Sequence, residues 1–216
     1  MQLTDSYMRV FPPAILRRFE FREVRHAAAV LANTSPTEFA EIVQVLHGFW
    51  LKNDDFLVAG GAKSDVARRL DEAFRTLGWR EGQHDTTIVS ELRLMPYRAA
   101  GEKQATTVKT QVTAVGYKTD NVKAGVALDV EWNAKDGNLD RDIGAFRALY
   151  DAGVISAGVI LTRTTADLRA LGRRIGRDPL GTTTTTNIEK LEPRMTRGDA
   201  GGCPVLAVAI TARCHR

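Results

Sequence analysis

The stretch Val126-Ala127-Leu128-Asp129-Val130-Glu131-Trp132 places acidic residues on a short apolar strand. Successive side chains of a strand point to opposite faces, so the apolar positions 126, 128, 130 and 132 share one face. Asp129, Glu131 and Asn133 share the other. Positions two apart on a strand are separated by about 6.6 Å, so a metal ion or a pair of ions can lie between the two carboxylates. Oxygen ligands of this kind favour Mg²⁺ or Mn²⁺ over Zn²⁺.

A third carboxylate, Asp120, precedes Asp129 by nine residues. This spacing allows a hairpin whose turn contains Asn121 and Gly125, which would bring the acids together. Crowded like charges raise at least one pKa unless a cation compensates. The alternative is a solvated edge strand whose acids are exposed or paired with nearby lysines, namely Lys118 and Lys123.

Bulk composition indicates one globular domain spanning residues 1–216. The chain has 216 residues, 44% of them hydrophobic, which is enough to bury a core. Two cysteines near the end of the sequence have no zinc-like spacing partners, and no disulfide framework is indicated. No segment has the pattern of a secretion signal or a membrane span, so we expect a cytoplasmic protein with no membrane partner.

Positive charge is concentrated in residues 163–216, which carry ten Lys or Arg against five Asp or Glu. Such a segment would suit a polyanion through phosphate contacts. The alternative is a set of solvated helix faces, on which exposed arginine is ordinary.

Periodicity predicts an α/β order of elements. Helices are expected at residues 35–48, 64–78, 140–151, 166–175 and 187–191. Strands are expected at residues 87–94, 106–115, 126–132, 154–161 and 204–209, with a loop at 96–104 and a turn at 135–138. The apolar run at 154–161 is typical of a buried central strand, so the C-terminal half reads as an α/β core.

A run of five threonines, followed by Asn187, forms another polar feature: Thr182, Thr183, Thr184, Thr185 and Thr186. Their hydroxyl groups could contact phosphates or base edges of a nucleic acid. The alternative is a solvated loop before the short helix at 187–191.

Several segments in a common order resemble the BglII/BstYI family of type II restriction endonucleases. The resemblance extends over about residues 66–210 and is carried by Thr119-Asp120, Val122-Lys123, residues 126–132, Leu70-Asp71-Glu72-Ala73-Phe74, Gly78-Trp79-Arg80-Glu81, Arg197-Gly198 and the strand from Pro204. It implies a PD-(D/E)xK nuclease fold, in which a central mixed sheet is flanked by helices. Residues 1–60 would form an N-terminal strand and helical part, and residues 61–216 the nuclease core and the segments that recognise DNA.

The same resemblance assigns roles to the acidic hairpin. Asp120 and Asp129 would bind the metal, and the carbonyl of Val130 could be a further ligand. Glu131 occupies the third catalytic position, where BglII and BstYI have glutamine and BamHI has glutamate, so this position is BamHI-like. Glu131 could deprotonate the attacking water, or it could only ligate the metal.

The function implied by the resemblance is Mg²⁺-dependent cleavage of double-stranded DNA at a short palindromic site. Mn²⁺ is expected to substitute for Mg²⁺, and a GATC centre is an expectation taken from the relatives. Family enzymes act as homodimers, which suits a palindrome. The setting would be a bacterial cytoplasm, in which a cognate DNA methyltransferase protects the host without being a stable subunit.

The resemblance implies that DNA is recognised by segments beside the strand at 126–132, which would carry the catalytic acids. Lys135 is the best candidate to read a guanine, while Asn133 and Asn138 could suit adenine. The remaining candidates are residues 182–187, Arg194 and Arg197. Two other functions stay open: a structure-specific or repair nuclease on the same core, and a non-catalytic DNA-binding protein.

Overall fold

The computed structural model describes residues 1–56, 64–177 and 185–216 and divides into two compact units. One unit contains Met1–Gly82 and Lys118–Arg216, and the other contains Gln83–Tyr117. The expected single domain over residues 1–216 stays a prediction.

The first unit is built on a mixed sheet, as the family resemblance implies, and among the described residues this sheet has seven strands. Its order is β1 (Leu3–Thr4), β2 (Phe19–Val24), β9 (Val205–Ile210), β8 (Ala157–Arg163), β7 (Val126–Val130), β6 (Lys118–Lys123) and β3 (Arg80–Gln83). β8 pairs in parallel with both β7 and β9. The pairs β1–β2, β2–β9 and β6–β7 are antiparallel. Every residue of β8 is buried, which confirms the central strand, although it begins three residues later than expected.

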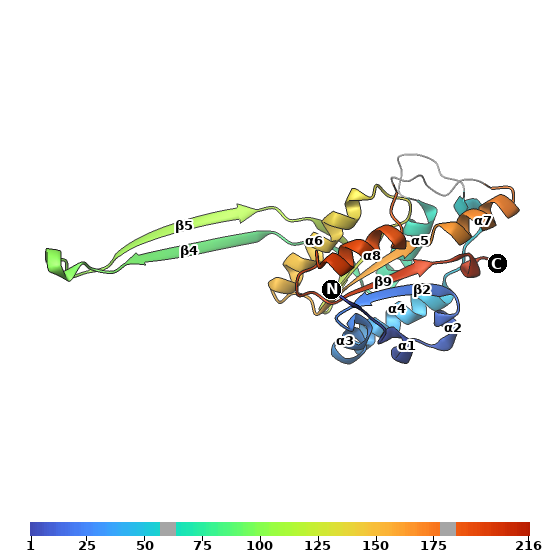
Figure 1. Cartoon of the computed structure of the whole chain (residues 1–216), viewed down its shortest axis with the longest axis horizontal. Helices are drawn as coiled ribbons and strands as arrows, with labels where there is room; N and C mark the ends of the chain where they lie inside the picture. The colour runs from blue at the N-terminus through green and yellow to red at the C-terminus, as the bar shows by residue number, and fades with distance from the viewer. Residues whose placement is uncertain (57–63, 178–184) are drawn as a thin grey trace. The chain divides into compact units, whose positions relative to one another are not determined.

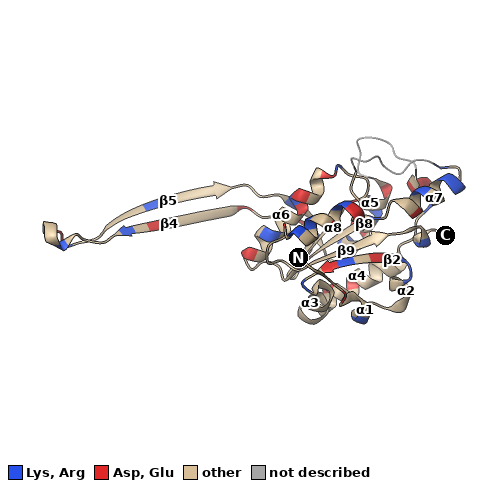
Figure 2. Cartoon of the chain, viewed as in Figure 1, with Lys and Arg blue, Asp and Glu red and all other residues tan. Residues whose placement is uncertain are grey.

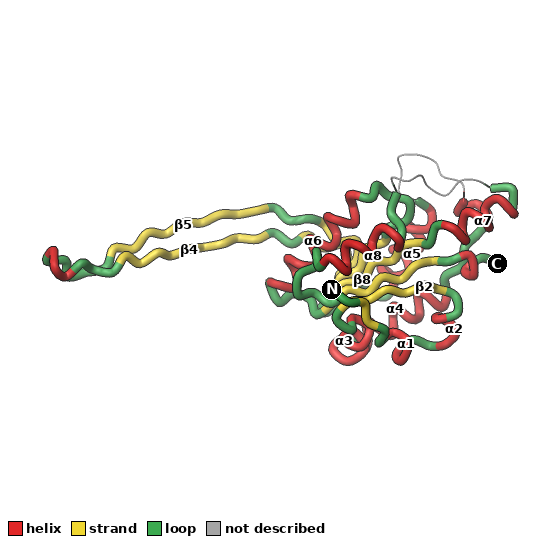
Figure 3. Tube along the Cα trace, viewed as in Figure 1, coloured by secondary structure: helices red, strands yellow, loops and turns green. Residues whose placement is uncertain are grey.

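Helices flank the sheet (Figures 1 and 3). Between the helices and the sheet lie two apolar clusters. The first cluster takes side chains from α1 (Tyr7–Val10), α2 (Pro13–Leu16), α3 (Ala27–Thr34), α4 (Pro36–Gly48), α5 (Asp65–Thr76) and α7 (Ala166–Arg174). The second takes them from α6 (Gly137–Asp151) and α8 (Ile188–Arg197). Short 3-10 helices occupy Asn53–Phe56 and Ala212–Cys214. This is the α/β layering expected from the order of elements.

β7 shows the predicted alternation. Val126, Leu128 and Val130 enter the first cluster, and Ala127 between them enters the second. Because β7 lies between β6 and β8, the alternative of a solvated edge strand is wrong.

A tight hairpin joins β6 to β7. Its register pairs Lys123 with Val126, so the turn consists of Ala124 and Gly125, both at positive φ (38° and 83°). Such a two-residue turn matches the twist of the flanking strands. Asn121 lies in β6, opposite Leu128, and not in the turn as predicted.

The turn predicted at 135–138 is confirmed, because the amide of Asn138 donates to the carbonyl of Lys135 at 3.0 Å. Two helix boundaries were predicted wrongly. α6, expected from residue 140, begins at Gly137. The helix expected to end at Leu191 continues to Arg197 through Pro193. Proline removes a helical hydrogen bond at a cost of about 3 kcal/mol, and burial of Ile188, Leu191 and Met195 along one side of α8 outweighs that cost.

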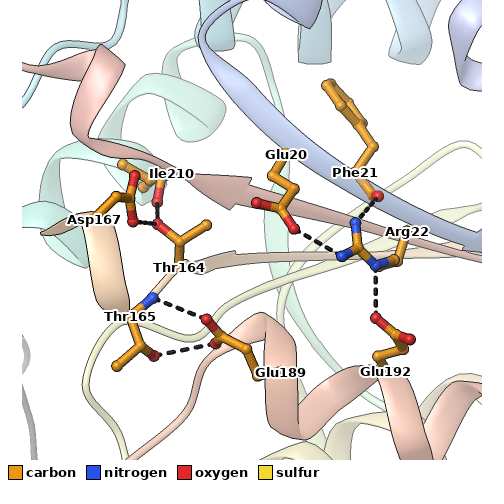
Figure 4. A network of polar contacts seen from close by, with 9 residues as sticks. All are labelled: Glu20, Phe21, Arg22, Thr164, Thr165, Asp167, Glu189, Glu192 and Ile210. Atoms are coloured by element: carbon orange, nitrogen blue, oxygen red, sulfur yellow. Dashed lines mark hydrogen bonds and ion pairs between the residues drawn. The ribbon is translucent and has the colours of Figure 1, made fainter.

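Polar contacts hold α8 against the sheet (Figure 4). Arg22 of β2 bonds Glu192 at 2.6 Å and Glu20 at 2.8 Å. Glu189 accepts bonds from the amide and the hydroxyl of Thr165, both at 3.1 Å, at the point where α7 begins. These contacts fix the start of α8 relative to β8 and α7.

The second unit is an antiparallel ribbon of β4 (Thr86–Leu94) and β5 (Thr106–Ala114), close to the two predicted strands. A 3-10 turn at Arg98–Ala100 lies within the predicted loop. All residues of both strands are exposed. No helix in the described part of the chain is long and apolar enough to cross a membrane.

Gly158→Ala should destabilise the protein, because an added Cβ on β8 would lie 2.2 Å from the ring of Phe146 on α6. Overpacking of this kind costs about 1–3 kcal/mol. The matched control is Gly144→Ala on α6, where nothing lies within 4 Å and alanine should stabilise the helix by about 0.5–1 kcal/mol. Thermal unfolding followed by circular dichroism measures both, and a Gly158→Ala protein as stable as the wild type would contradict this packing.

Candidate active site

The β6–β7 hairpin brings Asp120 beside Asp129. The amide of Asp120 donates to Oδ1 of Asp129 at 2.7 Å, and the amide of Val130 donates to Oδ2 of Asp120 at 3.3 Å. Each aspartate therefore binds the backbone of the opposite strand, and the hairpin itself fixes the positions of both carboxyl groups.

Glu131 follows β7 directly and is held by its backbone. Its amide donates to the carbonyl of Leu161 at 2.8 Å. Its carbonyl accepts the hydroxyl groups of Thr162 at 3.0 Å and Thr186 at 3.1 Å. The residue is only 3% exposed, and Oε1 of its side chain lies 3.4 Å from Nδ2 of Asn138.

α6 adds two residues that the sequence reasoning missed, Arg141 and Asp142. Asp142 is fully buried and accepts two bonds from the guanidinium of Arg141, at 2.9 and 3.0 Å. Arg141 also lies 3.8 Å from Glu131. A signal was present, since Asp142 falls at helical spacing within the buried stripe formed by Leu139, Ile143 and Phe146.

A cavity of about 240 Å³ opens over this cluster. It is lined by Ser64, Ala67, Asp120, Val130, Glu131, Trp132, Asn133, Ala134, Asn138 and Arg141. The walls therefore come from the start of α5, the β6–β7 hairpin, the segment after it and the start of α6. A reacting group of a substrate could reach the acids from this side.

The lysines of the hairpin do not balance the charge of the cluster. Figure 2 colours the Lys and Arg positions of the chain blue and the Asp and Glu positions red. Lys118 pairs with Glu81 at 2.9 Å, and Lys123 pairs with Glu41 at 2.6 Å. The alternative in which these lysines neutralise the acids is therefore wrong. Arg141 is in place, but one guanidinium cannot balance the three carboxyl groups of Asp129, Glu131 and Asp142.

Electrostatics show the cost of this crowding. Burial, followed by the nearby charge of Asp142, raises the pKa of Asp129 well above its ordinary value. The same two causes raise the pKa of Glu131 to about 9, and burial raises the pKa of Asp142. Glu131 therefore holds a proton at neutral pH when no cation is bound.

Three buried oxygens accept no bond from a nitrogen or hydroxyl donor of the described residues: Oδ2 of Asp129, Oε2 of Glu131 and Oδ2 of Asp142. The carboxyl groups of Glu131 and Asp142 are hydrogen-bonded to each other when Glu131 is protonated, which leaves Oδ2 of Asp129 without a donor. Unpaired buried oxygens of this kind need a proton or a cation. Hard carboxylate oxygens suit Mg²⁺. Within residues 1–56, 64–177 and 185–216, however, no three acidic, histidine or cysteine side chains form a ready-made ligand set. Charge and the unpaired oxygen of Asp129 favour a cation here, whereas ligand geometry alone does not.

The structure brings together two segments proposed to recognise DNA. Lys135 forms an isolated β-bridge with Thr185, and the amide of Thr186 donates to the carbonyl of Ala134 at 2.9 Å. Asn133 and Asn138 line the cavity. Lys135, which follows the lining residue Ala134 in sequence, is exposed.

Arg163 joins these segments and was not predicted to do so. It is fully buried at the end of β8 and donates to Oδ1 of Asn133 at 2.8 Å and to the hydroxyl of Thr185 at 2.9 Å. Burial lowers its pKa to about 10. Asn133 has a positive φ of 55°, so Arg163 holds a strained backbone position as well as two side chains.

The other candidate residues have different surroundings. Thr182, Thr183 and Thr184 lie outside the described residues. Thr186 and Asn187 are buried, and Asn187 caps α8 by accepting the amide of Lys190. Arg194 forms two bonds with Asp140, and Arg197 pairs with Asp199 at 2.6 Å. Neither arginine belongs to the described lining of the cavity.

Comparison with known proteins gives one family. The model of the family described as "Restriction endonuclease BglII/BglIII" matches residues 19–210. The match includes the hairpin, α6 and the segment up to β9. No curated protein matches the chain.

Glu131→Gln should stabilise the metal-free protein at alkaline pH. The folded pKa of about 9 lies above the ordinary 4.5, so the folded chain holds this proton more tightly than the unfolded chain. Stability is therefore lost as pH rises from about 4.5 towards about 9. The amide of glutamine cannot ionise. In EDTA, the melting temperature of the variant minus that of the wild type should grow by several degrees between about pH 5 and pH 8.5.

The control for this measurement is Glu81→Gln, which removes an exposed carboxylate paired with Lys118. Its difference from the wild type should not rise in the same window. If the Glu131→Gln difference is independent of pH, the carboxyl group is not protonated in the folded protein.

Proposed function

The chain belongs to the BglII/BglIII family of restriction endonucleases, and we propose that its acidic cluster holds Mg²⁺ for the hydrolysis of phosphodiester bonds. It is a type II site-specific deoxyribonuclease that acts on DNA. Membership favours this activity over a structure-specific repair nuclease or a non-catalytic DNA-binding protein.

The observation that supports a cation is Oδ2 of Asp129, which is buried without a donor in a cluster of like charges. Asp120 and Asp129 would hold the ion, with the carbonyl of Val130 as a further ligand. A divalent cation at this place would acidify water and offset the charge that develops on the phosphate. Mn²⁺ has the same preference for oxygen ligands and is expected to substitute.

The remaining groups of the cluster would act on Glu131. Asn138 and Arg141 approach its Oε1 at 3.4 and 3.8 Å and fix the orientation of the carboxyl group. With a pKa of about 9, Glu131 is protonated in the metal-free chain and cannot accept a proton from water. A bound cation would favour the ionised form, in which Glu131 serves either as base or as ligand.

DNA recognition is proposed for the joined segments around residues 133–138 and 185–187. Lys135 is exposed and can donate to a guanine, and Asn133 and Asn138 are the candidates for adenine. The bonds from Arg163 preorganise this region, because they fix Asn133 and Thr185 before DNA binds. Thr182, Thr183, Thr184, Thr186, Asn187, Arg194 and Arg197 stay as proposed DNA contacts, of which Thr186, Asn187 and the two arginines already have partners within the protein.

We further propose a homodimer on a palindromic duplex site, with a GATC centre as the first sequence to test. The described residues carry one acidic cluster, and a double-strand cut needs two such sites related by a twofold axis. A bacterial cytoplasm with a cognate methyltransferase is the setting that such an enzyme requires.

Asp129→Ala should abolish cleavage, by at least about a hundredfold, because it removes a proposed ligand on β7. Digestion of plasmid DNA with Mg²⁺, followed by sequencing of the ends, measures activity and site together. Asp151→Ala is the control, since Asp151 ends α6 and makes only a solvent-exposed pair with Arg147. Dimer formation and binding to the same duplex should persist in both variants, and retained cleavage by Asp129→Ala would exclude the metal assignment.

A further inference from the structure

The β4–β5 ribbon has two chemically different faces. Residues directly opposite each other in an antiparallel pair share a face. On one face, Ile88 lies opposite Val112 and Leu92 lies opposite Val108. Together with Leu94 and Ala114, these residues form what we term the apolar face of the ribbon: Ile88, Leu92, Leu94, Val108, Val112 and Ala114.

The opposite face is polar and internally paired. Glu91 and Lys109 face each other and form an ion pair at 3.2 Å. The hydroxyl groups of Thr87 and Thr113 lie 3.2 Å apart. This face can remain in water, because its polar groups bond to one another or to solvent.

The apolar face is exposed to solvent. Its five large residues are 47–64% exposed: Ile88, Leu92, Leu94, Val108 and Val112. A two-stranded ribbon is marginally stable in water by itself. Contiguous apolar surface on a soluble protein usually marks an interaction site. The alternation along both strands therefore predicts a partner for this face in particular.

The chemistry of the face selects the kind of partner. The other positions on it are Thr86, Ser90, Thr106 and Thr110, so the face has no charged side chain. Protein surfaces that bind DNA rely on Lys and Arg to contact phosphates. On this ribbon the cations Arg93 and Lys109 lie on the opposite face. The apolar face is therefore suited to another apolar protein surface and not to a nucleic acid.

We infer that the apolar face of the ribbon packs against the same face of a second copy of the chain. This inference rests on the homodimer of the proposed function, which supplies an equimolar partner. The face is also suited to pairing with itself, because the short pair Ser90–Thr110 lies between the bulky pairs Ile88–Val112 and Leu92–Val108. A twofold axis placed between the Ser90–Thr110 and Leu92–Val108 pairs would set the bulky pair of one copy against the short pair of the other.

The size of the contact limits its contribution. Strands of nine residues are roughly 30 Å long and the pair about 10 Å wide, so two ribbons would bury on the order of 600 Å². Stable interfaces bury about 1,200 Å² or more. The ribbon contact therefore strengthens the dimer and does not form it alone.

The direct test compares Leu92→Glu with Val89→Glu in the full chain, free of DNA. Both place one carboxylate on β4, on the apolar and the polar face respectively. Sedimentation over a range of concentrations should show that Leu92→Glu raises the dissociation constant of the dimer at least tenfold and that Val89→Glu leaves it unchanged. Equal effects, or none, would overturn the inference. A loss of DNA affinity by Leu92→Glu with an unchanged dimer would also overturn it.

A second measurement does not depend on how Leu92→Glu folds. Ser90→Cys and Glu91→Cys place thiols at adjacent positions on opposite faces, and the native Cys203 and Cys214 are buried. Packed sheets lie about 10 Å apart, which is too far for a disulfide. A bifunctional thiol cross-linker longer than this distance should link Ser90→Cys into a covalent dimer and leave Glu91→Cys largely unlinked. Equal linking would contradict face-to-face packing.

The two measurements also distinguish the contact between ribbons from the homodimer on which it rests. A wild-type protein that is monomeric at every concentration would refute the homodimer. A wild-type dimer whose stability does not depend on Leu92 would refute only the role of the ribbon.

Discussion

The burial of several carboxyl groups in one place is the constraint on which the site depends. Asp129 of β7, Glu131 just after it and Asp142 of α6 are all buried, while the lysines of the hairpin are paired elsewhere. Ionised together, these groups would repel one another in a medium that solvates them poorly. The fold tolerates them because the backbone holds Asp129 and Glu131 through β-sheet bonds and because Arg141 approaches Asp142 and Glu131. In the metal-free chain, a proton on Glu131 reduces this repulsion. In the active enzyme, a bound cation would reduce it.

Much of the fold could be predicted because its local signals agree with its packing. The alternation in β7 and the apolar run of β8 are both realised, since each reflects burial on defined faces. α5 begins at Asp65, directly after the predicted N-cap Ser64, whose hydroxyl oxygen accepts a bond from the amide of Ala67. The length of α8 could not be predicted in the same way. Pro193 is locally a helix breaker, and only tertiary burial of Met195 and its neighbours explains why the helix continues.

The candidate site was predictable where its residues are close in sequence and obscure where they are distant. The hairpin joins Asp120 and Asp129 through a register set by nearby residues. Asp142 and Arg163 reach the site through the packing of α6 and β8, which no local pattern specifies. Arg163 was counted among basic residues suited to a polyanion, yet it is fully buried and joins Asn133 to Thr185. A charged residue at an inward position of a helix or of a buried strand was the signal in both cases.

On the proposed assignment the cluster exchanges a proton for a cation, and the ionisation of Glu131 reports this exchange most directly. The ¹³C shift of its side-chain carboxyl group, assigned by comparison with Glu131→Gln, can be followed against pH. Without Mg²⁺ the group should titrate near pH 9, as its buried and acidic surroundings require. With saturating Mg²⁺ it should be ionised at neutral pH. Titration near the ordinary value of 4.5 in both conditions would contradict the account.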